Sequence, residues 1–421
     1  MNNRTTSLLI ITIIALFCYK SIAQGDVTSP YSFIGLGDNH KKGNIRSLSM
    51  GGTDIASRSS MYINMMNPAG LSGIDSMSFV GNLGAALNNS SYRTSDLTSK
   101  FSSANINHLA IAFPLAKWWK TSVLLLPYSS MGYEVYDYGT VENGGTTEFV
   151  YEGDGGMDAI VWGNAFSLTD KLAIGINSTY YFGKLEHSKG VNFPDSAFIF
   201  NTMFKEKVVL KGLFFEAGLQ YHQPLDATNT LSFGLTYGNK SKLSATFDYL
   251  SMTYFGDDIY NNSTLDTIRV WTGQNITLEL PYTVGAGVTW VKKDKLTVAA
   301  DFHFENWENF KYKDFPLGLS NKLSANIGAE FIPQSNTLSA YWKMIHYRLG
   351  FRYEHLGMKF EDTELKEYAL TVGFGLPLRK SKTFVDLGFE FGQNGTIDKS
   401  LIQERYVRVM LGIAIKESWF R

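Results

Sequence analysis

Residues 407–416 read VRVMLGIAIK, and this stretch decides the fold class. The residues at odd positions are all branched and apolar: Val407, Val409, Leu411, Ile413 and Ile415. The residues between them are mostly small or charged: Arg408, Met410, Gly412, Ala414 and Lys416. Successive side chains of a β-strand point to opposite faces, so this segment has one apolar face and one mixed face. Such a strand is typical of a sheet with lipid on one side and a wet or plugged lumen on the other.

The same period of two recurs upstream, most clearly at residues 172–182, 282–290 and 347–353. Short connections alternate with long polar ones, which we expect to be loops at 88–104, 131–156, 185–204, 250–280, 307–320 and 394–400. An open sheet edge in hydrocarbon would leave backbone groups unpaired, so the sheet has to close. At about 25 residues per strand and connection, residues 76–421 predict an all-β, antiparallel transmembrane barrel of about 14 strands. Residues 231–254 count as one long, bent strand, since splitting them at 238–242 would break the even parity.

The composition excludes several other classes of protein. The 421 residues carry a formal net charge of -1, which excludes a polybasic nucleic-acid binder. An aromatic share of 14% argues against a disordered chain, and a single cysteine cannot form a disulfide framework. Beyond the first two dozen residues, no apolar run is long enough for a transmembrane helix. The apolar residues are instead spread over alternate positions.

Residues 1–23 are expected to be a cleaved signal peptide. Residues 8–18 are an unbroken apolar stretch, and Ser21 and Ala23 place small residues where a signal peptidase reads, so cleavage is expected after Ala23. One alternative is an uncleaved anchor. The other is a lipoprotein acylated at Cys18, which the bulky residue before this cysteine disfavours.

At the other end of the chain, Trp419 and Phe420 are aromatic residues that an outer-membrane barrel-assembly machinery would read during biogenesis. Export followed by barrel assembly predicts an integral protein of a Gram-negative outer membrane, in contact with outer-membrane lipid.

Residues 24–75 do not alternate and are rich in glycine. We expect this segment to be a plug that folds into the lumen of a barrel formed by residues 76–421. The alternative is a disordered periplasmic arm. The apolar residues Met50, Met61, Met65 and Leu71 argue against it, because they need an apolar surface to pack against.

Two motifs in this segment resemble the N-terminal hatch signature of the FadL/TodX outer-membrane transporters of hydrophobic compounds. The first is Met50-Gly51-Gly52 in the stretch SLSMGG, and the second is Asn67-Pro68-Ala69-Gly70. Further stretches fit the same family: the Pro127-Tyr128 step, residues 235–237 with 242–243, and residues 301–310. Residues 388–419 also resemble a subgroup of outer-membrane proteins from Bacteroidetes-type bacteria.

The resemblance implies a 14-stranded barrel closed by a hatch, which passes apolar molecules towards the periplasm. In that family the ligand leaves sideways, beside a kink in the third strand, and Pro127 and Tyr128 are the matching positions. A proline removes one ladder hydrogen bond, so it permits such a gap. The alternative is that Pro127 simply ends a strand that turns into a loop at Ser129.

Six charged residues fall on the inward faces of the late strands: Arg348, Arg352, Glu354, Asp386, Glu390 and Arg408. They could clamp a ligand carboxylate against arginine forks. The reading we favour is a lumenal ion-pair network that holds the plug to the barrel wall.

No catalytic motif such as HExxH, GxSxG or a Walker sequence occurs, and the scattered histidines give no metal-ligand spacing. The sequence therefore predicts a non-enzymatic protein without cofactor or metal. The resemblance implies a channel for uptake of hydrophobic small molecules by binding and passive, lateral diffusion. The first alternative is a non-transporting barrel that acts as a scaffold or shuttle partner in protein secretion or surface attachment. A barrel enzyme would need a Ser–His pair, and His108 has no serine partner in the sequence pattern.

Overall fold

The computed structural model describes residues 29–418 apart from 142–144, 196–198, 256–263, 309, 313–314, 317–318, 335, 337–338, 361–362 and 380. The expected signal peptide and the C-terminal residues Trp419 and Phe420 lie outside the described residues. None of the helices in the described part of the chain is long and apolar enough to cross a membrane.

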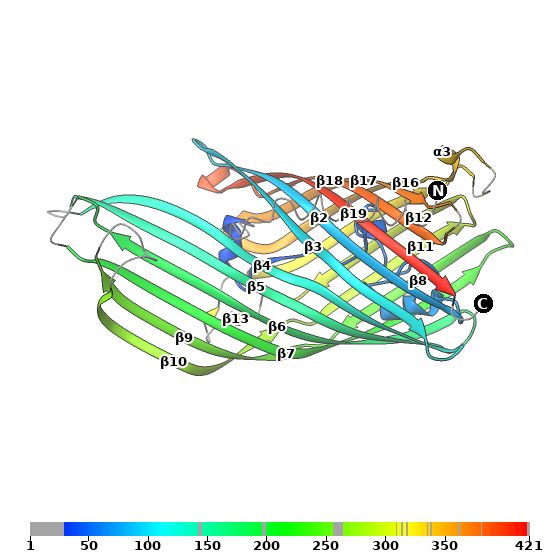
Figure 1. The fold of residues 1–421 in the computed structure, drawn as a ribbon, viewed down its shortest axis with the longest axis horizontal. Coiled ribbons are helices and arrows are strands. Elements are labelled where there is room, and N and C mark those ends of the chain that lie inside the picture. The colour runs from blue at the N-terminus through cyan, green and yellow to red at the C-terminus, as the bar shows by residue number, and fades with distance from the viewer. Residues whose placement is uncertain are drawn as a thin grey trace.

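The described strands form a closed antiparallel barrel (Figure 1), in which β19 pairs with β2 from Gln403–Arg93 to Ser418–Ser78. The barrel segments are β2 (Ser78–Arg93), β3 (Thr98–Pro114), β4 (Trp119–Val141), β5 (Gly145–Ser167), β6 (Leu172–Asn192), β7 (Asn201–Pro224), β8 (Asn229–Gly238), β9 (Ser241–Tyr254), β10 (Thr264–Leu280), β11 (Thr283–Lys292), β12 (Leu296–Glu305), β15 (Leu319–Phe331), β16 (His346–Phe360), β17 (Thr363–Pro377), β18 (Thr383–Asn394) and β19 (Gln403–Ser418). The remaining elements are η1 (Pro30–Phe33), β1 (Asp38–Asn39), α2 (Ile45–Leu48), η2 (Pro68–Gly73), β13 (Lys311–Tyr312), β14 (Phe315–Pro316), α3 (Tyr341–Met344) and η3 (Asp398–Ser400).

The described wall has 14 strands, as predicted, because two pairs of segments are each one long, bent strand. β8 and β9 both pair with β7, and they are separated only by Asn239 and Lys240. On their other side, β11 pairs with β8 and β10 pairs with β9, with Pro281 and Tyr282 between them. The prediction that residues 231–254 form one bent strand is thus confirmed.

Outward-facing and inward-facing residues alternate along the wall, as the period of two predicts. On β5, Ile160 and Trp162 are exposed on the outside, whereas Ala159 and Val161 are buried inside. On β16, Leu349 is exposed, while its neighbour Arg348 is buried. The outer face therefore presents apolar side chains to lipid, and the inner face carries small and charged residues.

Four of the long connections that we expected as loops are largely strands where they are described, and for them the expectation is wrong: 88–104, 131–156, 185–204 and 250–280. Residues 394–400 connect β18 to β19 as predicted, and the described part of 307–320 holds only β13, β14 and the start of β15. β4 and β5 pair from Trp119–Phe166 to Val141–Gly145, so most of residues 131–156 is a two-stranded extension of the wall. β6 with β7 and β9 with β10 extend in the same way. Beyond the lipid both faces of a strand meet water, so nothing selects apolar residues at alternate positions and the sequence looks like a loop.

Residues 29–77, called the N-terminal segment below, pack against the inner face of the barrel (Figure 1). η2 contacts β4, β5, β6 and β7, while α2 contacts β17, β18 and β19. The side chains of Ile45, Met50, Ile63 and Met65 are at most 2% exposed. The methionines of the segment are thus packed in the apolar environment that they require.

One place in the wall lacks a continuous ladder. β3 pairs with β4 only from Leu109–Leu125 to Pro114–Lys120, although both strands continue further from this point. Beyond it, β3 pairs with β2 alone and β4 pairs with β5, and the two strands diverge (Figure 1). The edge of β4 is then covered for two residues by β1, at Asp38–Ser130 and Asn39–Ser129.

Candidate functional site

The Met50-Gly51-Gly52 turn lies directly against the barrel wall. The Gly51 amide donates to Thr371 Oγ1 at 2.9 Å, and Gly51 has a φ of 71°. A Cβ on Gly350 of β16 would lie 2.1 Å from the Gly51 nitrogen. Glycine is therefore required on both sides of this contact, because any side chain on Gly350 would push the turn away.

Asn67 holds the second motif to the wall. Its Oδ1 accepts from the Ala69 amide at 3.0 Å and so caps η2, which begins at Pro68. Its Nδ2 donates to the carbonyl of Leu219 on β7 at 3.2 Å. A Cβ on Gly218 would lie only 2.1 Å from Asn67 Oδ1. The inward-facing glycines, which the sequence suggested as lining of a lumen, thus make room for the N-terminal segment.

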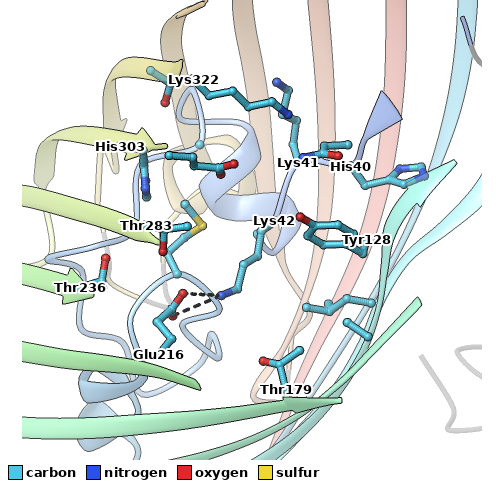
Figure 2. Close-up of a pocket in the computed structure, with 18 of the residues that line it drawn as sticks. His40, Lys41, Lys42, Tyr128, Thr179, Glu216, Thr236, Thr283, His303 and Lys322 are labelled. Atoms are coloured by element: carbon cyan, nitrogen blue, oxygen red, sulfur yellow. Dashed lines mark hydrogen bonds and ion pairs between the residues drawn. The ribbon is translucent and has the colours of Figure 1, made fainter. Parts of the chain in front are cut away.

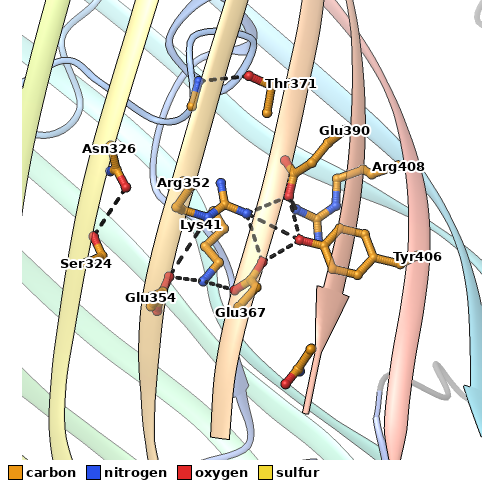
Figure 3. Close-up of polar contacts among 12 residues, drawn as sticks. Lys41, Ser324, Asn326, Arg352, Glu354, Glu367, Thr371, Glu390, Tyr406 and Arg408 are labelled. Atoms are coloured by element: carbon orange, nitrogen blue, oxygen red, sulfur yellow. Dashed lines mark hydrogen bonds and ion pairs between the residues drawn. The ribbon is translucent and has the colours of Figure 1, made fainter. Parts of the chain in front are cut away.

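The predicted inward charges form two clusters rather than one. In the first (Figure 3), Arg352 Nη2 lies 2.5 Å from Glu390 Oε1 and 2.9 Å from Glu367 Oε1. Arg408 Nη1 approaches the same Glu390 oxygen at 3.3 Å. Lys41 of the N-terminal segment reaches in from above, with Nζ 2.9 Å from Glu367 Oε2.

The pKa of Lys41 is higher than that of an isolated buried lysine would be. Burial alone would lower its pKa, but Glu354 and Glu367 raise the pKa above its ordinary value. Lys41 Nζ lies 2.5 Å from Glu354 Oε2. The predicted residue Glu354 therefore binds the N-terminal segment directly.

In the second cluster, Arg348 bridges two carboxylates, with Nε 2.7 Å from Glu330 Oε2 and Nη1 2.5 Å from Asp386 Oδ1. Arg46 of α2 donates to Glu330 from Nε at 3.1 Å and from Nη2 at 3.0 Å. The Tyr62 hydroxyl donates to Asp386 Oδ1 at 2.9 Å. The second cluster, like the first, joins the N-terminal segment to the wall.

Several members of these clusters were absent from the sequence prediction: Lys41, Arg46, Tyr62, Glu330, Glu367 and Tyr406. Glu330 and Glu367 share the inward parity of their strands, so the period of two could have found them. The residues of the N-terminal segment carry no such periodic signal, because their partners are set only by the folded chain.

A cavity of about 220 Å³ lies beneath the split between β3 and β4 (Figure 2). Its lining includes the apolar residues Leu126, Pro127, Tyr128, Val161, Tyr181, Phe214 and Leu280. It also includes the polar residues Lys41, Lys42, Glu216, His303 and Lys322. Lys42 Nζ lies 3.3 Å from Glu216 Oε1. The cavity can thus receive an apolar body beside a polar end group.

Pro127 lies where the wall splits. The ladder between β4 and β5 changes register between Pro127 and Ser129, which is the mark of a bulge. β4 continues through this position to Val141, so Pro127 does not end the strand. Tyr128, the next residue, packs on Tyr181 in the cavity wall, with ring centroids 4.6 Å apart and ring planes tilted by 60°.

His108 is buried, and its Nδ1 lies 2.7 Å from Asn107 Oδ1. Among the described residues, no group of three or more histidines, cysteines or carboxylates is placed to hold a metal ion.

Solved structures of hydrocarbon channels share this architecture. The toluene transporter TodX of Pseudomonas putida is 17% identical, with a TM-score of 0.63 over 91% of this chain and 99% of that chain. A FadL homologue of Pseudomonas aeruginosa is 11% identical, with a TM-score of 0.61 over 91% and 100%. The CymD monoaromatic hydrocarbon channel is 15% identical, with a TM-score of 0.58 over 91% and 99%. At these identities the likeness concerns the fold.

No curated protein matches the sequence significantly. A family profile described as BamG matches residues 6–421, which is nearly the whole chain. The predicted FadL-type architecture and outer-membrane location are thereby confirmed, whereas the likeness of residues 388–419 to a Bacteroidetes subgroup stays a prediction. The chain is an integral outer-membrane β-barrel of FadL type, and it belongs to the BamG family.

Proposed function

We propose that this barrel passes small hydrophobic molecules, with or without a polar end group, from the cavity into the outer membrane through the split between β3 and β4. The observation that carries the proposal is the position of the cavity. Leu126, Pro127 and Tyr128 line it, and they stand on β4 just past its last pair with β3, Leu109–Leu125. An apolar solute gains little from a water-filled pore, but it can move from an apolar pocket into lipid.

Residues 24–75 would serve as the hatch in this proposal. The two ion-pair clusters support this role, since Lys41 and Arg46 tie the segment to β15, β16 and β17. The predicted roles of Arg348 and Arg352 are then structural: both guanidinium groups already have carboxylate partners, so an anionic ligand would have to compete with them.

β1 would be the movable part of the exit. The His40 amide donates to the Tyr128 carbonyl at 2.9 Å, and the Ser129 hydroxyl donates to the Leu36 carbonyl at 2.6 Å. These few bonds are what closes the β4 edge next to the cavity. Each is worth about 1 kcal/mol net, so a bound solute can offset their loss.

The test is a matched pair of tryptophan variants on β5. Ala159 lines the cavity, whereas its neighbour Ile160 is 42% exposed on the lipid face. Ala159→Trp should fill much of the cavity and lower uptake of a hydrophobic dye or toluene into proteoliposomes by at least about tenfold, because a bound solute is excluded. Ile160→Trp should leave uptake unchanged. Equal uptake by both variants would rule out this cavity as the route.

A second candidate is the non-transporting scaffold. The observation that favours it is the charge at the cavity, where Lys41, Lys42 and Glu216 reduce the apolar surface offered to a solute. The Bam name of the family points in the same direction, towards barrel assembly. A stable complex with outer-membrane assembly or secretion proteins, unaffected by Ala159→Trp, together with purified protein free of lipid ligands, would support this candidate over transport.

A further inference from the structure

The outer part of β4 is a strand edge without a strand beside it. β5 pairs with one side of β4 up to Val141, whereas β3 leaves the other side at Leu125. β1 covers only Ser129 and Ser130. Among the described residues, no strand pairs with this side of β4 from Tyr133 to Val141.

The backbone groups that face the open side can be identified. The Tyr128 carbonyl accepts from His40, and the Gly132 amide donates to Ser32 Oγ at 3.2 Å, so even-numbered residues point away from β5. In an antiparallel ladder this direction alternates from residue to residue. Glu134 and Tyr136 therefore present their amide and carbonyl groups to the open side, which is the template that an added strand needs. Tyr138 presents its carbonyl there, because its amide already donates to Asp137 Oδ1 at 2.9 Å.

This edge lies outside the lipid. β4 has 23 residues, whereas a strand crosses the bilayer with about 9–11. Val123 and Leu125 are exposed on the outer face of β4, close to the short turn before it. A crossing of this length that begins at Trp119 ends before Tyr133, so the exposed Val135 lies beyond it. Residues 133–141 thus project beyond the membrane surface, on the side of the longer strand extensions (Figure 1).

The charge of this region is of one sign. Between Lys120 and Lys171 the sequence contains no lysine or arginine, while the β4–β5 extension carries Glu134, Asp137, Glu148, Glu152 and Asp154. Glu134 and Glu152 stand directly opposite each other in the ladder. Like charges in this position are unfavourable, and a cation placed beside them would relieve the repulsion.

Aromatic side chains accompany these carboxylates. Tyr136 and Tyr138 are 50% and 65% exposed. The Tyr136 hydroxyl donates to Glu134 Oε1 at 2.5 Å, so ring and carboxylate form one surface. Such a surface suits lysine and arginine side chains, which can pack their stems on rings and place their charge at carboxylates.

We propose that the β4 edge from Tyr133 to Val141 docks an extended, lysine- or arginine-rich segment of a partner protein, which adds to the sheet as a further strand. The main-chain bonds to Glu134, Tyr136 and the Tyr138 carbonyl give affinity, and the acidic rim selects a cationic partner. This role is separate from passage of a solute through the cavity, which lies at the other end of the β3–β4 split.

The test uses the full barrel in detergent and a fluorescent peptide of about ten residues, alternating lysine with threonine or valine, matched in length to the edge. Three further probes are the same peptide with N-methylated backbone, the glutamate analogue, and the cationic peptide at high salt. We expect the cationic peptide to bind, the glutamate analogue not to bind, and N-methylation to weaken binding by at least about tenfold.

Three variants separate strand addition from charge attraction. Tyr136→Pro removes an amide on the open side, a position where an edge strand accepts proline, and it should weaken peptide binding by about tenfold; Tyr136→Ala keeps the amide and should retain most of it. The double variant E134Q/D137N should weaken binding and its salt dependence together.

Binding should also protect the amides of Glu134 and Tyr136 from hydrogen exchange. If the N-methylated peptide binds as well as the parent, or if Tyr136→Pro binds normally, attraction is merely electrostatic and the proposal is wrong. Absence of binding by the cationic peptide to the folded barrel would overturn it as well. Dye uptake by Tyr136→Pro should equal that of the wild type, so this result is independent of the proposed transport.

Discussion

Replacing Arg352 by methionine tests whether the ion-pair clusters fasten the N-terminal segment to the wall. Arg352 is 2% exposed, and its Nη2 holds both Glu367 and Glu390. Methionine fills much of the same space without charge, so two buried carboxylates lose their shared partner. Lys41 stays 2.9 Å from Glu367 and Arg408 stays 3.3 Å from Glu390, so neither carboxylate is left wholly uncompensated. Breaking a buried pair costs about 3–5 kcal/mol, and we expect the unfolding free energy to fall by about 3 kcal/mol.

The measurement is urea unfolding in detergent micelles or lipid vesicles, followed by tryptophan fluorescence and extrapolated to zero denaturant. Arg405 on the same barrel strand as Arg408 is the matched control, because it is exposed and donates to Gln393 at 3.2 Å. Arg405→Met should cost less than about 1 kcal/mol. Removing Glu390 as well, as Arg352→Met with Glu390→Gln, should recover part of the loss, since it leaves one buried carboxylate fewer.

A loss for Arg352→Met no larger than that for Arg405→Met would refute the anchoring argument. If stability is unchanged but binding of an anionic amphiphile is lost, Arg352 is instead part of a ligand clamp. The two readings of the inward charges are thus separated by one pair of measurements.

Three further predictions concern the N-terminal segment. Gly350→Ala should lower the unfolding free energy by at least about 1–3 kcal/mol, because its Cβ would overlap the Gly51 amide. The control is Gly81→Ala, whose Cβ would meet its nearest neighbour at 3.7 Å, and it should be nearly neutral in the same urea titration. Burial, reinforced by the nearby Asp301 carboxylate, raises the pKa of Asp54, so its stability contribution is fully present below the ordinary aspartate pKa and is lost as the pH rises through the raised value. Asp54→Asn should therefore stabilise the barrel at neutral pH, and equal stability of wild type and variant there would contradict this. Burial and then Arg408 lower the pKa of His40 to about 4, so the β1 contact with β4 should weaken as the pH falls from about 6.5 towards 4. A fall in the protection factor of the Ser130 amide over this range, corrected for its intrinsic exchange rate, would reveal the weakening, and His40→Gln should abolish that fall.

The barrel itself was predictable because lipid imposes a repeating pattern. Ile160 and Trp162, or Leu349 and Phe351, must be apolar at every second position wherever the wall meets hydrocarbon. The outer half of β4 escaped prediction for the same reason. Residues such as Glu134 and Asp137 stand in water, where both faces accept polar side chains and the strand is specified only by its pairing with β5.

Of the two ion-pair clusters, the residues on the barrel wall were predictable from the sequence, and those of the N-terminal segment were not. Arg348, Arg352 and Asp386 could be identified as inward-facing because each strand fixes their parity. Their partners Lys41 and Arg46 come from a segment without regular strands, whose path across the lumen depends on contacts with many strands at once. The inward glycines illustrate this limit: the period of two places Gly218 on the inner face, but the need for glycine there is set by Asn67 of the N-terminal segment.

The two clusters also bear on how a solute would pass. Withdrawing the N-terminal segment as one body would separate Lys41 from Glu354 and Glu367, Arg46 from Glu330, and Tyr62 from Asp386. Arg348 and Arg352 of the wall would still bind these carboxylates. The larger cost is exposing the buried apolar side chains of the segment, such as Ile45, Met50, Ile63 and Met65, at about 1.5–3 kcal/mol each. Complete opening of the lumen would therefore approach the whole stability of an ordinary domain, about 5–15 kcal/mol. Releasing β1 from β4 breaks only a few neutral hydrogen bonds and leaves both clusters intact. The energetic comparison therefore favours a route that goes around the N-terminal segment and out beside Pro127 over one that goes straight through the barrel.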